Sequence, residues 1–344
     1  MKKIFDEQGT DAIILVDAAN AFNRLNRNVA LHNMQIICPP FATILINTYR
    51  IPARLFIVSG GEITSSEGTT QGDTLAMAFY GLSTKPIMEV LQNQVPEVLQ
   101  VWFADDATGA GKLEALKLWW DGIQKEGLRY GYFVKPSKSW IVLKDQSKLE
   151  QCEEIFRESP IQITCEGKRH LGAAVGTEQF KNEYIDDKVS KWTSNILTLS
   201  KIAQSQPHAA YAAFVHGEQH KYTYFMRTLN NISANLKPLD RAITESFLPA
   251  LFGHELSENE RNIVSMSLKE GGLGVKFVGA RSDSCYETSL KVTEPLSEQI
   301  RLQSSELPNG LKVAEAKHHV ITKVKAALIG RNQGGPNTKI ETDA

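Results

Sequence analysis

Two apolar stretches of the chain each end in aspartate. Residues 11–16, DAIILV, run into Asp17, and residues 98–104, VLQVWFA, run into Asp105 and Asp106. Both stretches are short, rich in β-branched or aromatic residues and bounded by polar residues, which is typical of buried strands. Because strands of one sheet can bring such ends side by side, we expect the three carboxylates to converge.

Converging carboxylates need a counter-charge. Like charges repel, so each carboxylate resists ionisation while the others are charged. Mg²⁺ is typically held by one or two carboxylates plus substrate phosphates. Two such ions about 3.5–4 Å apart can clamp the attacking and leaving oxygens of an in-line displacement. Asp17, Asp105 and Asp106 are therefore candidate ligands of two Mg²⁺ or Mn²⁺ ions.

A second aspartate pair provides an internal control. Asp186 and Asp187 lie in EYIDDKVSKW, where Ile185, Val189 and Trp192 repeat with helical spacing. Both aspartates then fall on the solvated face of a helix, and no glycine-rich turn follows them. We expect this pair to be surface charge.

The order of the predicted elements indicates an α+β fold. After the strand at 11–16 we expect a helix at 38–50, a hairpin around Gly60-Gly61, a helix at 74–91, strands on both sides of Asp105-Asp106, a helix at 112–128 and a strand at 139–144. A further hairpin is expected over 161–175, turning at Glu166-Gly167. This order favours an antiparallel sheet with helices on one face.

The second half of the chain has a mainly helical pattern. We place a domain boundary at 177–178, a helical domain over 178–331 and a disordered tail over 332–344, NQGGPNTKIETDA. Five basic residues between 312 and 331 are either a phosphate-contacting stripe or one face of a solvated helix.

Composition restricts the class of protein. The net charge of −1 gives no whole-chain indication of a nucleic-acid binder, although local basic patches can serve that purpose. The four cysteines lack Cys-x-x-Cys spacing and a nearby histidine, which favours reduced thiols over a zinc site. No apolar stretch approaches the ~20 residues of a membrane span. We therefore expect no membrane partner and an intracellular location, cytoplasmic or nuclear.

A series of motifs around the aspartates resembles the reverse transcriptase family. The stretches VDAANAF, EGTTQGD, WFADD, PSKSW and HLGAAVG occur in the order of that family's palm motifs, over residues 11–176. Each motif alone is weak, whereas their ordered co-occurrence is specific. The lysine loop PSKSW is most similar to the family's cellular retroelement branches.

The resemblance implies a fold, an activity and partners. The fold would be a polymerase palm over 1–177, an antiparallel sheet with helices on one face, followed by a thumb over 178–331. The activity would be that of a retrotransposon RNA-directed DNA polymerase, a nucleotidyltransferase with a two-metal mechanism. Its partners would be an RNA template, a DNA primer and deoxynucleotides; the sequence does not determine an oligomeric state.

The resemblance also implies catalytic residues. Asp17 and Asp105 would bind both metal ions, with Asp106 close by in support. Lys138 would stabilise or protonate the leaving pyrophosphate, a task that suits a cationic donor. Without the motif order, Lys138 would be interpreted as a solvated loop lysine. Leu171 and Gly172 would form the turn that grips the primer end.

Five further residues would contact the substrate. They are Ala18, whose backbone carbonyl would complete one metal shell, Ala21, Phe22, and Gln71 and Gly72, which would shape the floor beneath the nucleotide. The Phe22 ring would fill the space of a 2′-hydroxyl, the group by which a protein distinguishes RNA from DNA. Without the motif order, Phe22 would be interpreted as a core aromatic.

Alternative functions remain open at this point. Members of the family carry a fingers region before the first motif, and the 16 residues before Asp17 do not supply it. The resemblance thus implies a palm lacking most of the fingers, and a truncated remnant that only binds nucleic acid competes with an active polymerase. An RNA-directed RNA polymerase is a further hypothesis, which Phe22 disfavours.

Overall fold

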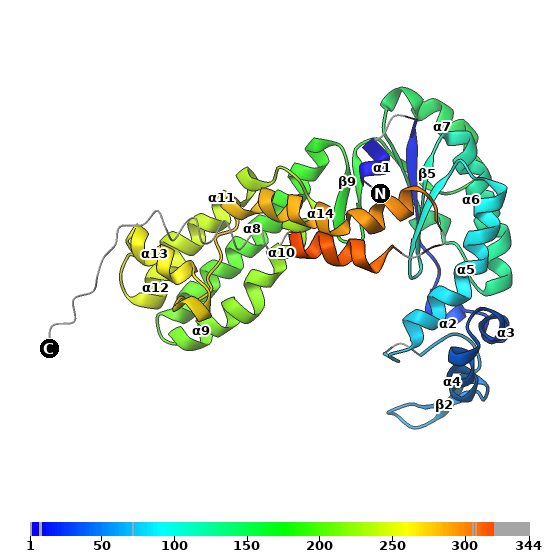
Figure 1. The fold of residues 1–344 in the computed structure, drawn as a ribbon, viewed down its shortest axis with the longest axis horizontal. Helices are drawn as coiled ribbons and strands as arrows, with labels where there is room; N and C mark the ends of the chain where they lie inside the picture. The colour runs from blue at the N-terminus through cyan, green and yellow to red at the C-terminus, as the bar shows by residue number, and fades with distance from the viewer. Residues whose placement is uncertain (1, 7–8, 71, 305, 307, 320–344) are drawn as a thin grey trace. The chain divides into compact units, whose positions relative to one another are not determined.

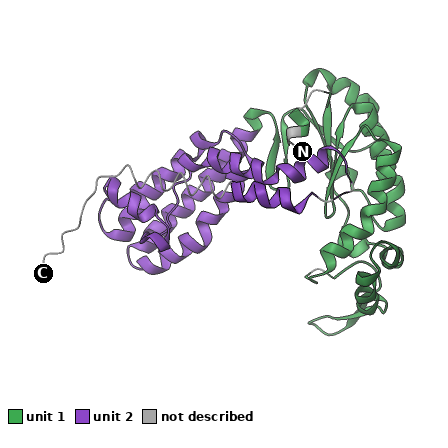
Figure 2. Ribbon diagram, viewed as in Figure 1, with its two compact units in different colours: residues 1–180 green, residues 181–344 purple. Residues whose placement is uncertain are grey.

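The chain folds into two compact units. The computed structural model describes residues 2–6, 9–70, 72–304, 306 and 308–319. The units comprise residues 1–180 and 181–344 (Figure 2), and the sequence places the domain boundary at 177–178. The predicted tail, 332–344, lies outside the described residues, as does most of the basic segment 312–331.

A five-stranded sheet forms the centre of the first unit, with the strand order β4-β5-β1-β6-β7. The strands are β1 (Ala12–Val16), β4 (Leu99–Phe103), β5 (Asp106–Gly111), β6 (Trp140–Leu143) and β7 (Gln162–Thr164). The pairs β4–β5, β5–β1 and β1–β6 are antiparallel, as predicted, whereas β6 and β7 pair in parallel. The strand that ends at Asp17 is therefore the middle strand of the sheet.

The two faces of β1 pack into separate hydrophobic clusters. Ile14 and Val16 belong to the larger cluster, which contains Trp119, and Ile13 belongs to a smaller one with Val175. This division follows from the strand geometry, because successive side chains point to opposite faces of a sheet. The apolar run at 12–16 is continuous because both faces of the strand are covered.

Helices cover mainly one face of this sheet, as predicted. Helices α5, α6 and α7 lie together on one side of the strands (Figure 1). The helices of the unit are α1 (Lys2–Asp6), α2 (Ala21–Arg24), α3 (Arg27–Ile37), α4 (Pro39–Tyr49), α5 (Ala76–Gln94), α6 (Leu113–Tyr130) and α7 (Leu149–Ile155). Pro39 and Pro40 begin α4, where the missing N–H groups cost nothing. Gly131 ends α6 in a left-handed conformation, and a Cβ there would lie 2.0 Å from the Arg24 carbonyl oxygen.

Two hairpins lie outside the main sheet. The first, β2 (Ala53–Phe56) with β3 (Glu62–Ser65), encloses Gly60-Gly61 as predicted. The second is β8 (Gly167–His170) with β9 (Ala173–Gly176), so the predicted turn at Glu166-Gly167 is wrong. Its turn is Leu171-Gly172, where both residues have positive φ (46° and 86°), as a two-residue hairpin turn favours.

The second unit is helical, as predicted. Its helices are α8 (Glu178–Ala203, which begins in the first unit), α9 (Pro207–Ala213), α10 (Gln219–Thr228), α11 (Ser233–Ala242), α12 (Leu248–Phe252), α13 (Glu258–Ser265) and α14 (Ser282–Arg301). The predicted apolar stripe of α8 is confirmed, since Ile185, Val189, Trp192 and Ile196 are all buried. Among the helices described, none combines the length and hydropathy required to span a membrane.

Candidate active site

Asp17 is held at the end of β1 by backbone contacts to the segment before β6. Its N–H donates to the Ser139 hydroxyl (3.0 Å), and its carbonyl accepts from the Lys135 N–H (2.8 Å). Ser139 is fully buried and donates in turn to the Lys135 carbonyl (3.0 Å). The segment 135–139 therefore determines where the Asp17 backbone lies.

Ala18 continues this backbone pairing. It forms an isolated antiparallel bridge with Val134, and the next N–H, that of Ala19, donates to the Phe133 carbonyl (2.7 Å). Hydrogen bonds alternate sides along an antiparallel pair. The Ala18 carbonyl accordingly points away from this pairing, and within the described chain no hydrogen bond to it is seen.

Asp105 and Asp106 lie at the turn between β4 and β5. Phe103 pairs with Asp106, so Ala104 and Asp105 form a two-residue hairpin turn, with Ala104 at φ 54°. The Tyr132 hydroxyl donates to the Asp105 carbonyl (2.8 Å), which ties the turn to the residues after α6.

The register of the sheet brings the two sites together. Val16 of β1 is opposite Ala107 of β5, so the next pair outward along these antiparallel strands is Asp17 opposite Asp106. Residues directly opposite one another have Cβ atoms about 4.5–5.5 Å apart. The predicted convergence of the two strand ends thus follows from the hydrogen-bond register.

Without a bound cation, the negative charges of Asp17, Asp105 and Asp106 repel one another. Desolvation by the surrounding protein raises the pKa of Asp106, and the neighbouring charges of Asp105 and Asp17 raise it further. The site therefore favours any bound cation that offsets these like charges.

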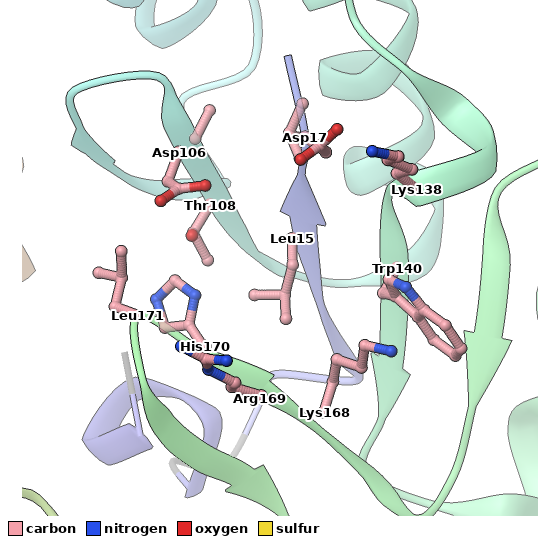
Figure 3. Close-up of a pocket in the computed structure, with 12 residues that line it drawn as sticks. Leu15, Asp17, Asp106, Thr108, Lys138, Trp140, Lys168, Arg169, His170 and Leu171 are labelled. Carbon is pink, nitrogen blue, oxygen red and sulfur yellow. The ribbon is translucent and has the colours of Figure 1, made fainter. Parts of the chain in front are cut away.

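Asp17 and Asp106 line a cavity of about 160 Å³. The other lining residues come from β1, β5, β6, the lysine loop, β8 and the turn after it: Leu15, Val16, Ala107, Thr108, Lys138, Trp140, Lys168, Arg169, His170 and Leu171. Figure 3 shows the amino end of Lys138 turned toward Asp17. Asp105 is absent from this lining, although its charge acts on Asp106.

The donor chemistry fits a hard divalent cation. Carboxylate and carbonyl oxygens are the ligands that Mg²⁺ prefers, and it takes the rest of its shell from water and phosphate. Within the described residues, no group of three or more His, Cys, Asp and Glu side chains is arranged as a complete metal-ligand set. Any ion here would thus depend on substrate or solvent oxygens for part of its coordination.

Three basic residues of β8 were missed in the sequence. Lys168, Arg169 and His170 line the cavity directly before the Leu171-Gly172 turn (Figure 3). Lys168 lies over the ring of Trp140, with its amino nitrogen 3.5 Å from the centroid. A run of three basic residues at the predicted primer-gripping turn was the available indication.

His170 differs from its two neighbours in charge. Burial, as the largest cause, lowers its pKa to about 4. The imidazole is therefore neutral near pH 7, and it offers the cavity a hydrogen-bonding group without a positive charge.

Phe22, at the start of α2, is half-buried and Ala21 is buried, and neither residue belongs to the lining of the cavity. The Phe22 ring stacks on Tyr80 of α5, with centroids 4.5 Å apart and planes at 22°. Tyr80 is a further residue that the sequence did not single out.

The loop before α5 is held in place by the side chain of Tyr49 in α4. The Tyr49 hydroxyl donates to Asp73 (2.5 Å) and accepts from the Thr70 N–H (3.3 Å). The Tyr49 hydrogen bond lowers the pKa of Asp73. Gly72 lies exposed between these anchors at φ 93°, and Gln71 lies outside the described residues.

The control pair behaves as expected of surface charge. Asp186 and Asp187 are exposed on α8. Asp187 pairs with Lys191 (2.8 Å), and Asp186 accepts from the Asn235 amide (2.8 Å). The two Asp-Asp pairs of this chain therefore have different surroundings, as their neighbouring residues predicted.

The chain is similar to known proteins only at the level of solved structures. No protein-family model matches the chain, and no curated protein matches it. Similar solved structures include apo telomerase from Candida tropicalis, at 12% identity and a TM-score of 0.45, with 92% of this chain and 54% of that chain covered. Telomerase from Candida albicans, in complex with a TWJ fragment of telomeric RNA, is similar at 11% identity and a TM-score of 0.43, with 89% and 53% covered. This chain thus spans about half the length of those chains, and at these scores the likeness supports no argument about activity.

Proposed function

We propose that this chain is the palm and thumb region of an RNA-directed DNA polymerase of retrotransposon type. The observation that supports the proposal is that Asp17 and Asp106, each one residue beyond the paired Val16 and Ala107 of two neighbouring strands, line one cavity with Lys138. The motif order around these residues supplies the second argument, because it is independent of the cavity.

In this function, Asp17 and Asp105 would hold two Mg²⁺ ions, with Asp106 beside them and the Ala18 carbonyl completing one shell. When bound, the ions would polarise the attacking and leaving oxygens and offset their charge. The raised pKa of Asp106 supports a role for a counter-cation at this edge of the sheet.

The remaining residues would bind and orient the substrates. Lys138 would donate to the leaving pyrophosphate, which carries developing negative charge. Gly72 and Gln71 would lie under the nucleotide, and the half-buried Phe22 ring would exclude a ribose 2′-hydroxyl. These roles favour deoxynucleotides as substrates.

The β8–β9 hairpin would hold the primer strand. Leu171 and Gly172 form its turn, and Lys168 and Arg169 lie beside them in the cavity. Basic side chains suit the phosphates of a nucleic-acid backbone. The RNA template and DNA primer would accordingly approach the carboxylates from this side.

Primer extension tests the proposal. The full chain would be given an RNA template, an annealed DNA primer, deoxynucleotides and Mg²⁺, and compared with Asp17→Asn, Asp105→Asn and Asp106→Asn. Asp187→Asn is the matched control, since it removes one charge from an equivalent Asp-Asp pair outside the site. We expect extension by the wild type and D187N and its loss in D17N and D105N. No extension by folded wild type would refute the polymerase activity.

A nucleic-acid-binding protein without turnover is the second candidate. It is supported by Lys168 and Arg169 in the cavity, because basic side chains can bind a nucleic-acid backbone without a bound metal. This candidate predicts that the wild type binds a primer–template duplex, that no variant alters extension because none occurs, and that Lys168→Ala weakens the binding.

A further inference from the structure

Trp140 and Lys168 reach the cavity from two different sheets. Trp140 begins β6 and lies opposite Leu15 of β1, whereas Lys168 belongs to β8 and lies opposite Val175 of β9. Residues directly opposite one another share a face of their sheet. Leu15 and Val175 pack into the same hydrophobic cluster, so Trp140 and Lys168 lie on the two surfaces through which the main sheet and the β8–β9 hairpin pack together. Both residues line the cavity that contains Asp17.

The two side chains are in direct contact. The Lys168 amino nitrogen lies 3.5 Å from the centroid of the Trp140 ring (Figure 3). Tryptophan is the aromatic residue that attracts a cation most strongly over its face. Within the described part of the chain, this amino group has no hydrogen bond or ion pair with another residue. The ring of Trp140 is therefore the contact that determines where the Lys168 ammonium lies.

This contact differs from an ion pair in its effect on charge. A carboxylate would neutralise the lysine, as Asp121 does for Lys117 on α6. An aromatic ring attracts the ammonium but leaves its positive charge uncompensated, and the ammonium keeps its N–H donors for an anion. Lysine side chains lose much rotamer freedom when they are fixed. A ring that fixes Lys168 before a ligand arrives therefore strengthens the binding of that ligand.

The surroundings of Lys168 suit a phosphodiester. Arg169 follows it along β8 and lines the same cavity, and the hairpin turn begins two residues later at Leu171. We propose that Trp140 is a positioning residue for Lys168: its ring holds the Lys168 ammonium in the cavity, where the ammonium binds a backbone phosphate of the primer strand. This inference rests on the proposed function, in which the hairpin holds the primer. Trp140 acts through Lys168 and carries out no chemistry itself.

The salt dependence of binding tests this role. A labelled DNA primer annealed to an RNA template would be titrated with the full chain at several salt concentrations, without nucleotides or Mg²⁺, and followed by fluorescence anisotropy. Each lost phosphate contact lowers the slope of log K against log salt concentration by about one. We expect that loss for Lys168→Ala and for Trp140→Leu, with W140L binding about two- to fivefold more weakly than the wild type, the effect of one exposed cation–π contact. Lys117→Ala is the matched control, because Lys117 is paired with Asp121 outside the cavity, and it should keep the wild-type slope.

Two further variants test the route of the effect. Trp140→Phe retains an aromatic face and should retain the wild-type slope. The double variant Trp140→Leu/Lys168→Ala should bind like K168A alone, because both changes remove the same contact and are not additive. A merely structural role of Trp140 would lower the melting temperature of W140L and leave its salt slope unchanged. Should W140L fail to fold, Trp140→Met replaces it, since a flexible methionine adapts to an irregular space.

A modified primer identifies the strand that supplies the phosphate. Uncharged methylphosphonate linkages near the primer 3′ end should lower the slope of the wild type by about one and leave that of K168A unchanged. Equal losses in the two proteins would overturn the assignment of the phosphate to the primer.

The remaining outcomes separate the inference from the function on which it rests. A wild-type slope in folded W140L, alongside a lowered slope in K168A, would overturn the role of Trp140. An unchanged slope in K168A would overturn phosphate binding by Lys168, and the role of Trp140 with it. Lowered slopes in both variants, without primer extension by the folded wild type, would overturn the polymerase activity and leave the positioning of Lys168 standing.

Discussion

Replacement of Arg27 by methionine tests how the loop before the Gln71-Gly72 motif is held in place. Arg27 lies in the first turn of α3 with 4% of its surface exposed. Its guanidinium donates four hydrogen bonds into one loop, to the carbonyls of Gly68 (3.0 Å), Ser65 (2.9 Å) and Glu67 (2.7 Å) and to the Ser65 hydroxyl (3.3 Å). Methionine retains much of the apolar stem and removes every donor.

The expected loss of stability follows from these contacts. Hydrogen bonds to a charged group contribute about 1.5–3 kcal/mol each, so four of them set an upper bound of about 6–12 kcal/mol. Burial of the guanidinium offsets part of this sum, and the same desolvation lowers the pKa of Arg27. Loss of one partner from a buried charged network typically costs about 3–5 kcal/mol. We expect a loss of that size for R27M, which corresponds to about 10 °C in melting temperature for a unit of this length.

Urea unfolding followed by tryptophan fluorescence measures the effect. Four of the five tryptophans, Trp102, Trp119, Trp120 and Trp140, belong to the first unit. Arg54→Met is the matched control, because Arg54 pairs with Glu62 at an exposed position with 67% of its side chain accessible. Exposed ion pairs contribute about 0.2–1 kcal/mol. An R27M variant as stable as R54M would refute the assignment of Arg27 as the anchor of the loop.

Three further predictions concern charge and hydroxyl groups near the site. Asp106→Asn should raise the melting temperature of the metal-free protein at pH 7, because the stability of the wild type falls as pH rises through the raised pKa of Asp106. The variant should also lose the stabilisation that added Mg²⁺ gives the wild type. A metal-free melting temperature below that of the wild type would contradict the first expectation. Tyr80→Phe removes a buried hydroxyl that has no hydrogen-bond partner among the described residues, so the free energy of unfolding should stay unchanged or rise. Tyr132→Phe loses the hydrogen bond to the Asp105 carbonyl and should lower the free energy of unfolding by about 1 kcal/mol in urea; the reverse order would count against both assignments. Because the pKa of His170 is lowered to about 4, the wild type should lose stability as pH falls from about 6.5 to about 4, by at most about 3 kcal/mol relative to His170→Asn. Parallel pH profiles of stability for the two proteins would show that His170 is not buried in a neutral form.

Local patterns in the sequence were sufficient to predict most strands and helices and the position of Asp17 and Asp106 at strand ends. The run before Asp17 is apolar because β1, the middle strand, is covered on both faces. The run before Asp105 is also apolar, although β4 is an edge strand and only partly buried, so the type and the end of both strands could be predicted. The helical period around Asp186-Asp187 likewise predicted a solvated pair, and Asp187 is indeed paired on the surface with Lys191. These predictions depend only on neighbours within a few residues.

The hairpin after β7 shows where local patterns fail. Glu166-Gly167 and Leu171-Gly172 are both plausible turns by composition, since each contains glycine. Gly167 has another reason to be glycine: a Cβ there would lie 2.6 Å from the Phe180 ring. Close packing against a side chain of α8, which the local sequence does not display, accounts for this glycine.

The geometry of the candidate site depends on tertiary structure. Asp17 and Asp106 line one cavity because β1 and β5 pair in the register that places Val16 opposite Ala107, and a shift of one residue would turn the strand's side chains to the other face. Ser139 holds Asp17, Tyr80 holds Phe22 and Arg27 holds the loop at 65–68 through contacts between residues far apart in the chain. The sequence by itself determined which residue types follow each strand, because strand and helix periodicities are local. Only the packed structure decided which of those side chains meet, because their distances follow from register and packing between segments.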